Sequence, residues 1–204
     1  MNIHKINKLF KIIILILILL LFFSSNKELF TIGSQHARLN NIYGEPLERC
    51  RTGTDNGSWD PDGYCSEMGG GVHQICFEVT TERKDFSTIT GQTDWSKERI
   101  GNNHCMCLGA YALYKAKPEN HGDNNELICE SIPEQSLTSK YINNWNTWNG
   151  NEIPEQIQKG VNSLVKQCFD RADNDEQRNY LRNKYDILRN EYGIEWNSEL
   201  ENNR

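Results

Sequence analysis

The chain has 204 residues, with 28 acidic and 22 basic side chains and a formal net charge of −6 at pH 7. This length suits one domain with appendages better than two full domains. Four of the basic residues precede the first acidic residue, Glu28, so the rest of the chain carries 18 basic residues against 28 acidic ones. An acidic body repels phosphate, and no basic patch offsets that repulsion, so nucleic acids are not expected as partners.

The amino-terminal segment combines lysines with an apolar run. Ile12 to Phe23 is an unbroken apolar stretch that follows three lysines, which is the pattern of a secretory signal. A bilayer crossing needs about 20 residues. The stretch reaches a marginal transmembrane length when it is counted from Leu9 to Ser25 with Lys11 snorkelling toward the interface.

This segment has two possible fates in the cell. The stretch "FFSSNKELF" offers no clean pair of small residues for cleavage, which favours an uncleaved signal-anchor over residues 1–25. The alternative is a signal peptide that is cleaved, giving a secreted protein. Residues 26–40 form a polar tether in either case. Positive charge before the apolar run places the remainder on the non-cytoplasmic side. The expected protein is therefore single-pass, with the membrane as its partner through the amino-terminal helix.

Residues 41–142 form the predicted main domain, which begins with a loop rich in Gly, Pro, Asp and Asn. Residues 72–81 are rich in β-branched and apolar side chains and predict a strand. Residues 105–116 predict a strand that continues as a short helix, because Ala and Leu accumulate toward the end. Residues 125–132 are a candidate short strand, and Pro133 is expected to start a turn or helix.

The carboxyl-terminal part predicts a helical hairpin over residues 154–204, after an Asn-rich linker at 143–153. Pro154 suits the first helical position. Asp173 with Glu176 resembles a capping box at the start of the second helix. Apolar residues follow helical spacing along both helices. They are Ile157, Val161, Leu164, Val165, Cys168 and Phe169 in the first helix and Leu181, Tyr185, Leu188 and Tyr192 in the second.

The predicted fold class is α+β: a small loop-rich domain of short strands and helices, with a hydrophobic helix before it and the helical hairpin after it. Placement outside the cytoplasm favours disulfide bonds between cysteines. The chain has seven cysteines, so at least one thiol stays free. Asn56 begins the single N-glycosylation sequon, "NGS", in a turn-rich loop.

Several motifs occur in a fixed order between residues 41 and 137. They are "YGEPLERC", "DGYC", "GVHQICFEVT", "DFS" and "HCMCLGAY". In order and spacing they resemble the DUF2237 family, a group of small, mostly bacterial proteins of unknown function. The matching positions are Gly44, Pro46, Leu47, Cys50, Asp62, Gly63, Cys65, Gly71, His73, Cys76, Thr80, Cys105, Cys107 and, loosely, Leu108. The resemblance implies a compact α+β domain and no known activity.

The chain departs from the family pattern at three positions. Tyr64 stands where the family has the first of two adjacent cysteines, and His104 stands where it has Trp. Pro133 replaces a family histidine, which weakens any mechanism that needs two histidines. The usual family members are cytosolic, so the apolar amino terminus implies that this version is retargeted.

Three hypotheses account for the cysteines and His73. A structural zinc site would use Cys65, His73, Cys76 and one of Cys105 or Cys107, because Cys and His are the preferred zinc ligands. The spacing of these residues is not that of a usual zinc knuckle. A thiol enzyme, either a nucleophile or a redox catalyst, would use a cysteine activated by His73, with His73 and Cys76 as the candidate catalytic residues.

The third hypothesis is structural. Cys50, Cys65, Cys76, Cys105 and Cys107 are the candidates for disulfides that staple the small domain, or for buried core positions. His73 would then be a hydrogen-bonded structural residue. A binding or structural role with no cofactor is the expected function. A thiol-redox or metal-dependent enzyme, with zinc as its metal, is the alternative.

Overall fold

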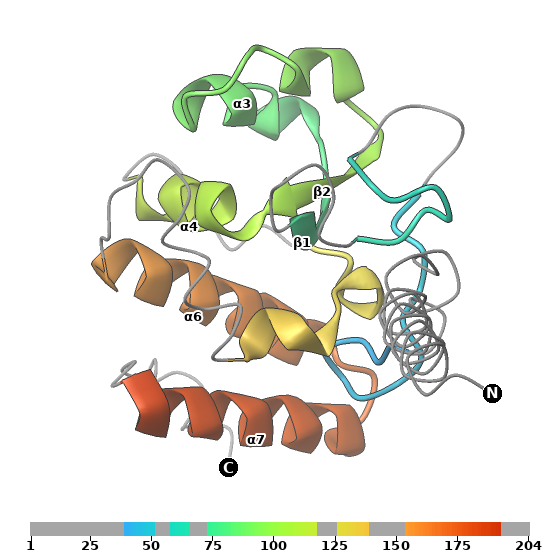
Figure 1. The fold of residues 1–204 in the computed structure, drawn as a ribbon, viewed down its shortest axis with the longest axis vertical. Coiled ribbons are helices and arrows are strands. Elements are labelled where there is room, and N and C mark those ends of the chain that lie inside the picture. Colours follow the sequence, from blue (N-terminus) through green and yellow to red (C-terminus); the bar gives the residue numbers. More distant parts are fainter. Residues whose placement is uncertain (1–38, 52–57, 66–72, 118–125, 139–153, 193–204) are drawn as a thin grey trace, which may run out of the picture. The chain divides into compact units, whose positions relative to one another are not determined.

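The computed structural model describes residues 39–51, 58–65, 73–117, 126–138 and 154–192 (Figure 1). The predicted apolar segment Ile12 to Phe23, the sequon at Asn56 and the linker 143–153 lie outside these residues. Within the described part of the chain, no helix is both long enough and apolar enough to span a bilayer.

The described residues form an α+β fold with a two-stranded antiparallel sheet. Strand β1 (His73–Glu78) pairs with β2 (Asn103–Cys107), and the register places Cys76 opposite Cys105 and Phe77 opposite His104. The register shifts between His73 and Ile75. A single bridge joins Phe77 to Leu127 on the other edge of β1. Because the central residues of β1 are buried, both faces of the strand contribute to the core.

The segment between the strands is built from short helical turns. They are η3 (Thr81–Arg83), α3 (Phe86–Ile89) and η4 (Ser96–Arg99). The hydroxyl groups of Ser87 and Ser96 lie 2.9 Å apart and join α3 to η4. The rings of Phe86 and Trp95 pack with their centroids 5.8 Å apart, so this segment closes over the end of the core through aromatic contacts.

The chain passes directly from β2 into helix α4 (Leu108–Ala116), as the sequence predicts. The short 3₁₀ helices η6 (Cys129–Ser131) and η7 (Glu134–Leu137) follow. Residues 125–132 were expected to form a strand, and that expectation is wrong except for the bridge at Leu127. The chain turns at this point because the amide groups of Ser131 and Ile132 donate to the carbonyl oxygens of Ile128 and Cys129.

Two long helices complete the fold, α6 (Pro154–Arg171) and α7 (Asp175–Tyr192), and they confirm the predicted helix pair. Figure 1 shows α4, α6 and α7 lying one beside the next. The predicted cap is displaced by one residue. The Asn174 side chain accepts the Gln177 amide at 2.9 Å, and the Gln177 side chain accepts the Asp173 amide at 2.7 Å. Asn174 therefore caps α7, in a box-like arrangement with Gln177.

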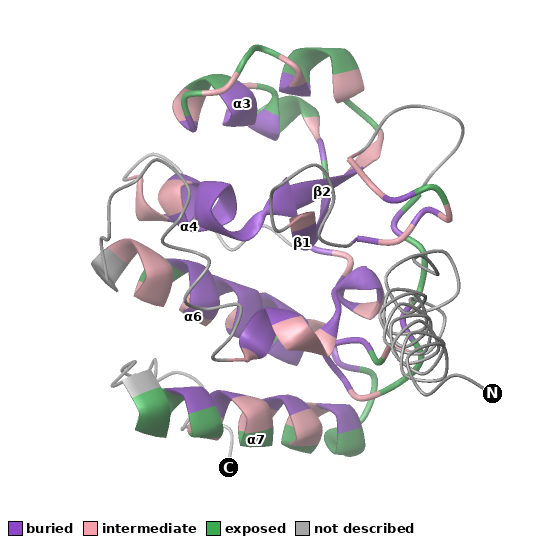
Figure 2. Cartoon of the chain, in the orientation of Figure 1, coloured by how far each residue is buried: buried purple, intermediate pink, exposed green. Residues whose placement is uncertain are grey.

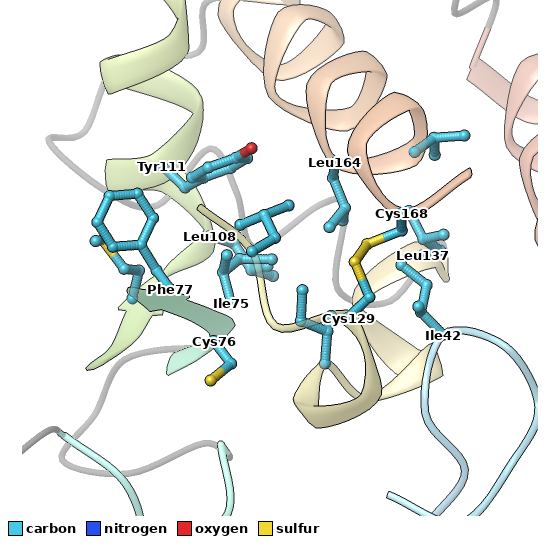
Figure 3. Packing of buried hydrophobic residues seen from close by; sticks show 14 of the residues in the cluster. Ile42, Ile75, Cys76, Phe77, Leu108, Tyr111, Cys129, Leu137, Leu164 and Cys168 are labelled. Atoms are coloured by element: carbon cyan, nitrogen blue, oxygen red, sulfur yellow. A yellow bond between two sulfur atoms is a disulfide. The ribbon is translucent and has the colours of Figure 1, made fainter. Parts of the chain in front are cut away.

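One core runs through the described residues from the sheet to α7 (Figures 2 and 3). Helix α6 buries one face against α4 and the other elements, with Leu164, Val165 and Cys168 fully buried. Helix α7 contributes Leu181, Tyr185 and Leu188. The helix pair thus shares its core with the loop-rich part of the chain, and a Cys129–Cys168 disulfide links η6 to α6.

Candidate functional site

Four cysteines gather beside the sheet, and they are called the cystine cluster here: Cys50, Cys65, Cys76 and Cys105. They form two disulfides, Cys50–Cys76 and Cys65–Cys105. All four side chains are fully buried. The Sγ atoms of Cys50, Cys65 and Cys76 lie within 4.8 Å of one another, and Cys105 is bonded to Cys65. Two disulfides are therefore packed against each other at one point of the core.

The strands and the preceding loops bring these cysteines together. Cys76 and Cys105 are opposite one another in the antiparallel ladder. The loop that carries Cys65 is turned by Asp60, whose Oδ1 accepts the amides of Asp62 and Tyr64 at 2.9 Å each. The Gly63 carbonyl then accepts the amide of Cys50 at 3.0 Å, so the two loops are joined by backbone hydrogen bonds.

Gly63 is required at this junction by its backbone geometry. Its φ is +91°, a region that residues with a side chain rarely adopt. A Cβ atom placed on it would also lie 2.8 Å from the Cβ of Arg51. The glycine of the "DGYC" motif therefore lets the loop that carries Cys65 pass close to the backbone at Cys50 and Arg51.

The structure separates the predicted cysteine candidates into two groups. All seven cysteines lie in described residues, and Cys50, Cys65, Cys76 and Cys105 are paired as the stapling hypothesis expects. Cys107, also a disulfide candidate, is a free thiol. The third disulfide, Cys129–Cys168, involves two cysteines outside the candidate set.

Cys107 is buried at the junction between β2 and α4, where it occupies the position just before the helix. Burial raises the pKa of its thiol to about 11. A thiol with this pKa is almost entirely protonated near neutral pH, and the thiolate is the nucleophilic form. The free cysteine therefore has the properties of a core residue and lacks those of a catalytic thiol.

The two candidate catalytic residues, His73 and Cys76, have different partners in the fold. Cys76 is bonded to Cys50, and the ladder places His73 opposite Cys107. The zinc set predicted from the sequence includes His73 and omits Cys50. The sulfur atoms that gather are those of Cys50, Cys65 and Cys76, and Cys105 is bonded to Cys65.

His104 lies next to the cystine cluster in sequence and is buried against Trp95. The two rings stack with centroids 4.0 Å apart, and the guanidinium of Arg99 lies over the Trp95 ring at 5.0 Å. Arg99 Nη1 is 2.8 Å from His104 Nδ1. Because arginine only donates, Nδ1 accepts this bond and the imidazole is neutral. Burial, with smaller contributions from Arg99 and His73, lowers the pKa of His104 to about 3.

A second group of buried polar residues joins α4, α6, η3 and the segment before η6. It is called the charged cluster here and consists of Arg83, Tyr111, Lys115, Glu126, Ser163 and Gln167. One Glu126 oxygen is 3.1 Å from Arg83, and the other is 2.5 Å from Lys115. The Gln167 amide nitrogen lies 3.1 Å from Glu126 and from the hydroxyl groups of Tyr111 and Ser163.

Sequence reasoning named the four cysteines of the cystine cluster among five disulfide candidates without predicting their pairing, and it missed the charged cluster and the third disulfide. Lys115 lies in α4 and Gln167 lies in α6, and polar side chains within helices are usually exposed to solvent. Cys168 lies on the apolar face of α6, which is also consistent with a core position without a partner. The one signal for Cys129 was its place between two apolar residues, Ile128 and Ile132.

The chain matches no protein-family model, no curated protein and no solved structure. The resemblance to the DUF2237 family therefore stays a prediction carried by the motifs. Gly44, one of the matching positions, has a φ of +82°, and a Cβ there would lie 2.6 Å from the Tyr180 ring. This contact between the opening motif and α7 gives Gly44 a structural role in this chain.

Proposed function

We propose that this chain is an exported or membrane-anchored α+β module of the DUF2237 type that acts by binding or as a structural element. Its cysteines cross-link the fold. The amino-terminal segment 1–25 anchors the chain in a membrane as a single-pass helix, with the remainder on the non-cytoplasmic side. Cleavage of that segment would give a secreted form.

The observation that supports this proposal is the state of the thiols. Six of the seven cysteines are joined in three disulfides, and the seventh is buried with a pKa raised to about 11. Stable disulfides are typical of oxidising compartments. They also contribute about 2–4 kcal/mol each to a small domain whose core is limited.

The alternative function is a thiol-redox or metal-dependent enzyme that uses His73 with Cys65, Cys76, Cys105 or Cys107. It requires a reactive thiol near His73. In the fold, three of these four cysteines are in disulfides, and Cys107 is shielded from solvent. The structural and binding role needs no reactive thiol and is therefore preferred.

Thiol counting by mass spectrometry on the full-length chain from an oxidising compartment tests the proposal. Iodoacetamide should add no label to the folded chain near neutral pH, one label after denaturation and seven after reduction. Peptide mapping should place the single label on Cys107. Three or more labels on the unreduced chain would contradict the proposal, and rapid labelling of folded Cys107 would favour the enzyme.

Membrane attachment needs a separate measurement. Cells that make the full-length chain are lysed and their membranes washed with alkaline carbonate. An anchored chain should stay in the pellet with the mass of residues 1–204, whereas the secreted alternative gives a shorter chain in the medium. A full-length chain in the soluble fraction would contradict both forms of export.

A further inference from the structure

Two disulfides share one small volume in the cystine cluster, which brings four cysteine sulfur atoms together at one point of the core. Three Sγ atoms from two different disulfides lie within 4.8 Å of one another. We propose that the four cysteines of this cluster bind one zinc ion when both disulfides are reduced. The same residues would then have two exclusive states: two disulfides, or one tetrahedral Cys₄ zinc site.

The spacing of the sulfur atoms suits zinc. A Zn–S distance of about 2.3 Å in a tetrahedral site places the sulfur atoms about 3.8 Å apart. The Sγ atoms of Cys50 and Cys76 are bonded at 2.02 Å, and the Sγ atom of Cys65 lies within 4.8 Å of both, so reduction would need to move Cys50 and Cys76 apart by about 1.8 Å to reach this separation. Cys105 lies in the disulfide with Cys65, and reduction lets that sulfur move out to ligand distance. Four thiolates from one closed, buried set are typical of structural zinc sites.

Contacts other than the disulfides hold the four cysteines in place. Cys76 and Cys105 are opposite residues of the β1–β2 ladder. Asn103 donates to the Cys50 carbonyl at 3.0 Å, and the Cys50 amide donates to Gly63. The Asp60 turn fixes the loop that ends at Cys65. The thiols therefore have a hydrogen-bonded frame that brings them together after reduction.

The redox step has a defined balance. Each disulfide takes two electrons and two protons from a dithiol reductant, whose two sulfur atoms leave joined as a disulfide. Two dithiol molecules thus give four cysteine thiols. The zinc ion then binds the four sulfur atoms and displaces their protons to solvent, so zinc affinity should rise with pH. The zinc state belongs to the chain in a reducing compartment or before oxidation.

The test uses the full-length chain in detergent, reduced with a trialkylphosphine and titrated with zinc chloride. One zinc ion should bind per reduced chain, and the oxidised chain should bind none. Cobalt substitution should give the absorption of tetrahedral thiolate-bound cobalt. A reduced chain that binds no zinc overturns the proposal. So does an oxidised chain that binds as much zinc as the reduced one.

Two double variants form a matched comparison, because each removes one disulfide. Cys65→Ser with Cys105→Ser should lower the zinc affinity of the reduced chain by at least about a hundredfold, since loss of ligands exceeds the effect of losing their outer-shell partners. Cys129→Ser with Cys168→Ser should leave the affinity unchanged. Equal affinity in the two variants would show that the zinc ion lies elsewhere.

Alkylation of the reduced wild-type chain with and without zinc gives the same answer without relying on the folding of a variant. Zinc should protect Cys50, Cys65, Cys76 and Cys105 and leave Cys129 and Cys168 reactive. Zinc-dependent protection of Cys129 and Cys168 overturns the assignment. This test concerns the reduced chain only, so the thiol count of the oxidised chain decides the proposed function separately.

Discussion

The cystine cluster and the charged cluster hold the same core in different ways. The first joins two loops to the strands β1 and β2 through two covalent bonds between fully buried cysteines. The second joins η3, α4 and α6 through a buried carboxylate shared by Arg83 and Lys115. Phe77 lies between the two clusters. It follows Cys76 in the sequence, and the guanidinium carbon of Arg83 lies over its ring, 5.9 Å from the ring centre.

This difference follows from what each region offers for packing. The described residues around Cys50 and Cys65 form no helix and no extended strand, and the covalent links limit the freedom of these loops in the unfolded chain. Helices α4 and α6 pack along their lengths and need no covalent link to each other. Their interface can therefore contain charges, provided that every charge has a partner in a low-dielectric surrounding.

Removal of both disulfides of the cystine cluster should have the largest effect on stability. The two bonds join residues 26 and 40 positions apart. Chain-entropy estimates give about 3.5 and about 4 kcal/mol, with a sum near 7 kcal/mol as an upper bound, because the two loops overlap. Replacement of all four cysteines by alanine should lower the free energy of unfolding by several kcal/mol in urea titrations followed by circular dichroism.

The control for this variant is Cys107→Ala, which removes a buried thiol but no cross-link. The free energy of unfolding should fall by about 1 kcal/mol in this variant, which is the expected effect of deleting one small buried group. Similar urea midpoints for the two variants would show that the disulfides contribute little. The region around the cystine cluster would then be held mainly by packing and backbone hydrogen bonds.

Loss of the Glu126 carboxylate should be the next largest effect. Glu126→Ala removes the shared partner of two buried cations and should lower the free energy of unfolding by about 3–5 kcal/mol. The matched surface change is Asp170→Ala, which breaks the Lys166–Asp170 pair on the exposed side of α6. That change should cost at most about 0.5 kcal/mol. A loss below about 1 kcal/mol for Glu126→Ala in urea titrations would show that the charged cluster is dispensable.

The sequence predicted the cystine cluster better than the charged cluster, for a physical reason. Apolar periodicity identifies α6 and α7. The accumulation of Ala and Leu at the end of residues 105–116 predicts the passage from β2 into α4. Cysteines in an exported chain are also a local signal for cross-links. The pairing itself depends on the ladder register that sets Cys76 opposite Cys105, which no local pattern contains.

Buried charges carry no such local signal. Lys115 and Glu126 become partners only when the segment before η6 returns against α4, and Gln167 joins them from α6. The strand expected at 125–132 failed for a related reason. Cys129 has its partner on α6, and a 3₁₀ turn at η6 lies where a second ladder would have continued. Tertiary contacts overrode the local β preference there.

Mild acid should have a smaller effect on stability, and it should act on only one of the two regions. His104 precedes Cys105 of the cystine cluster in the sequence, whereas the charged cluster contains no histidine. The pKa of His104 is about 3 in the fold, against 6.5 for the free side chain. Protonation therefore favours the unfolded chain. The stabilising contribution of neutral His104 is complete above pH 6.5 and decreases as the pH falls from 6.5 toward 3.

At pH 5 the loss of unfolding free energy should be about 2 kcal/mol relative to pH 7. Urea titrations at both pH values measure it, and His104→Gln should reduce the difference by that amount, even though the variant is less stable at pH 7. An unchanged difference in His104→Gln would assign the acid sensitivity to other groups and would leave the Trp95–His104 stack without a role in it.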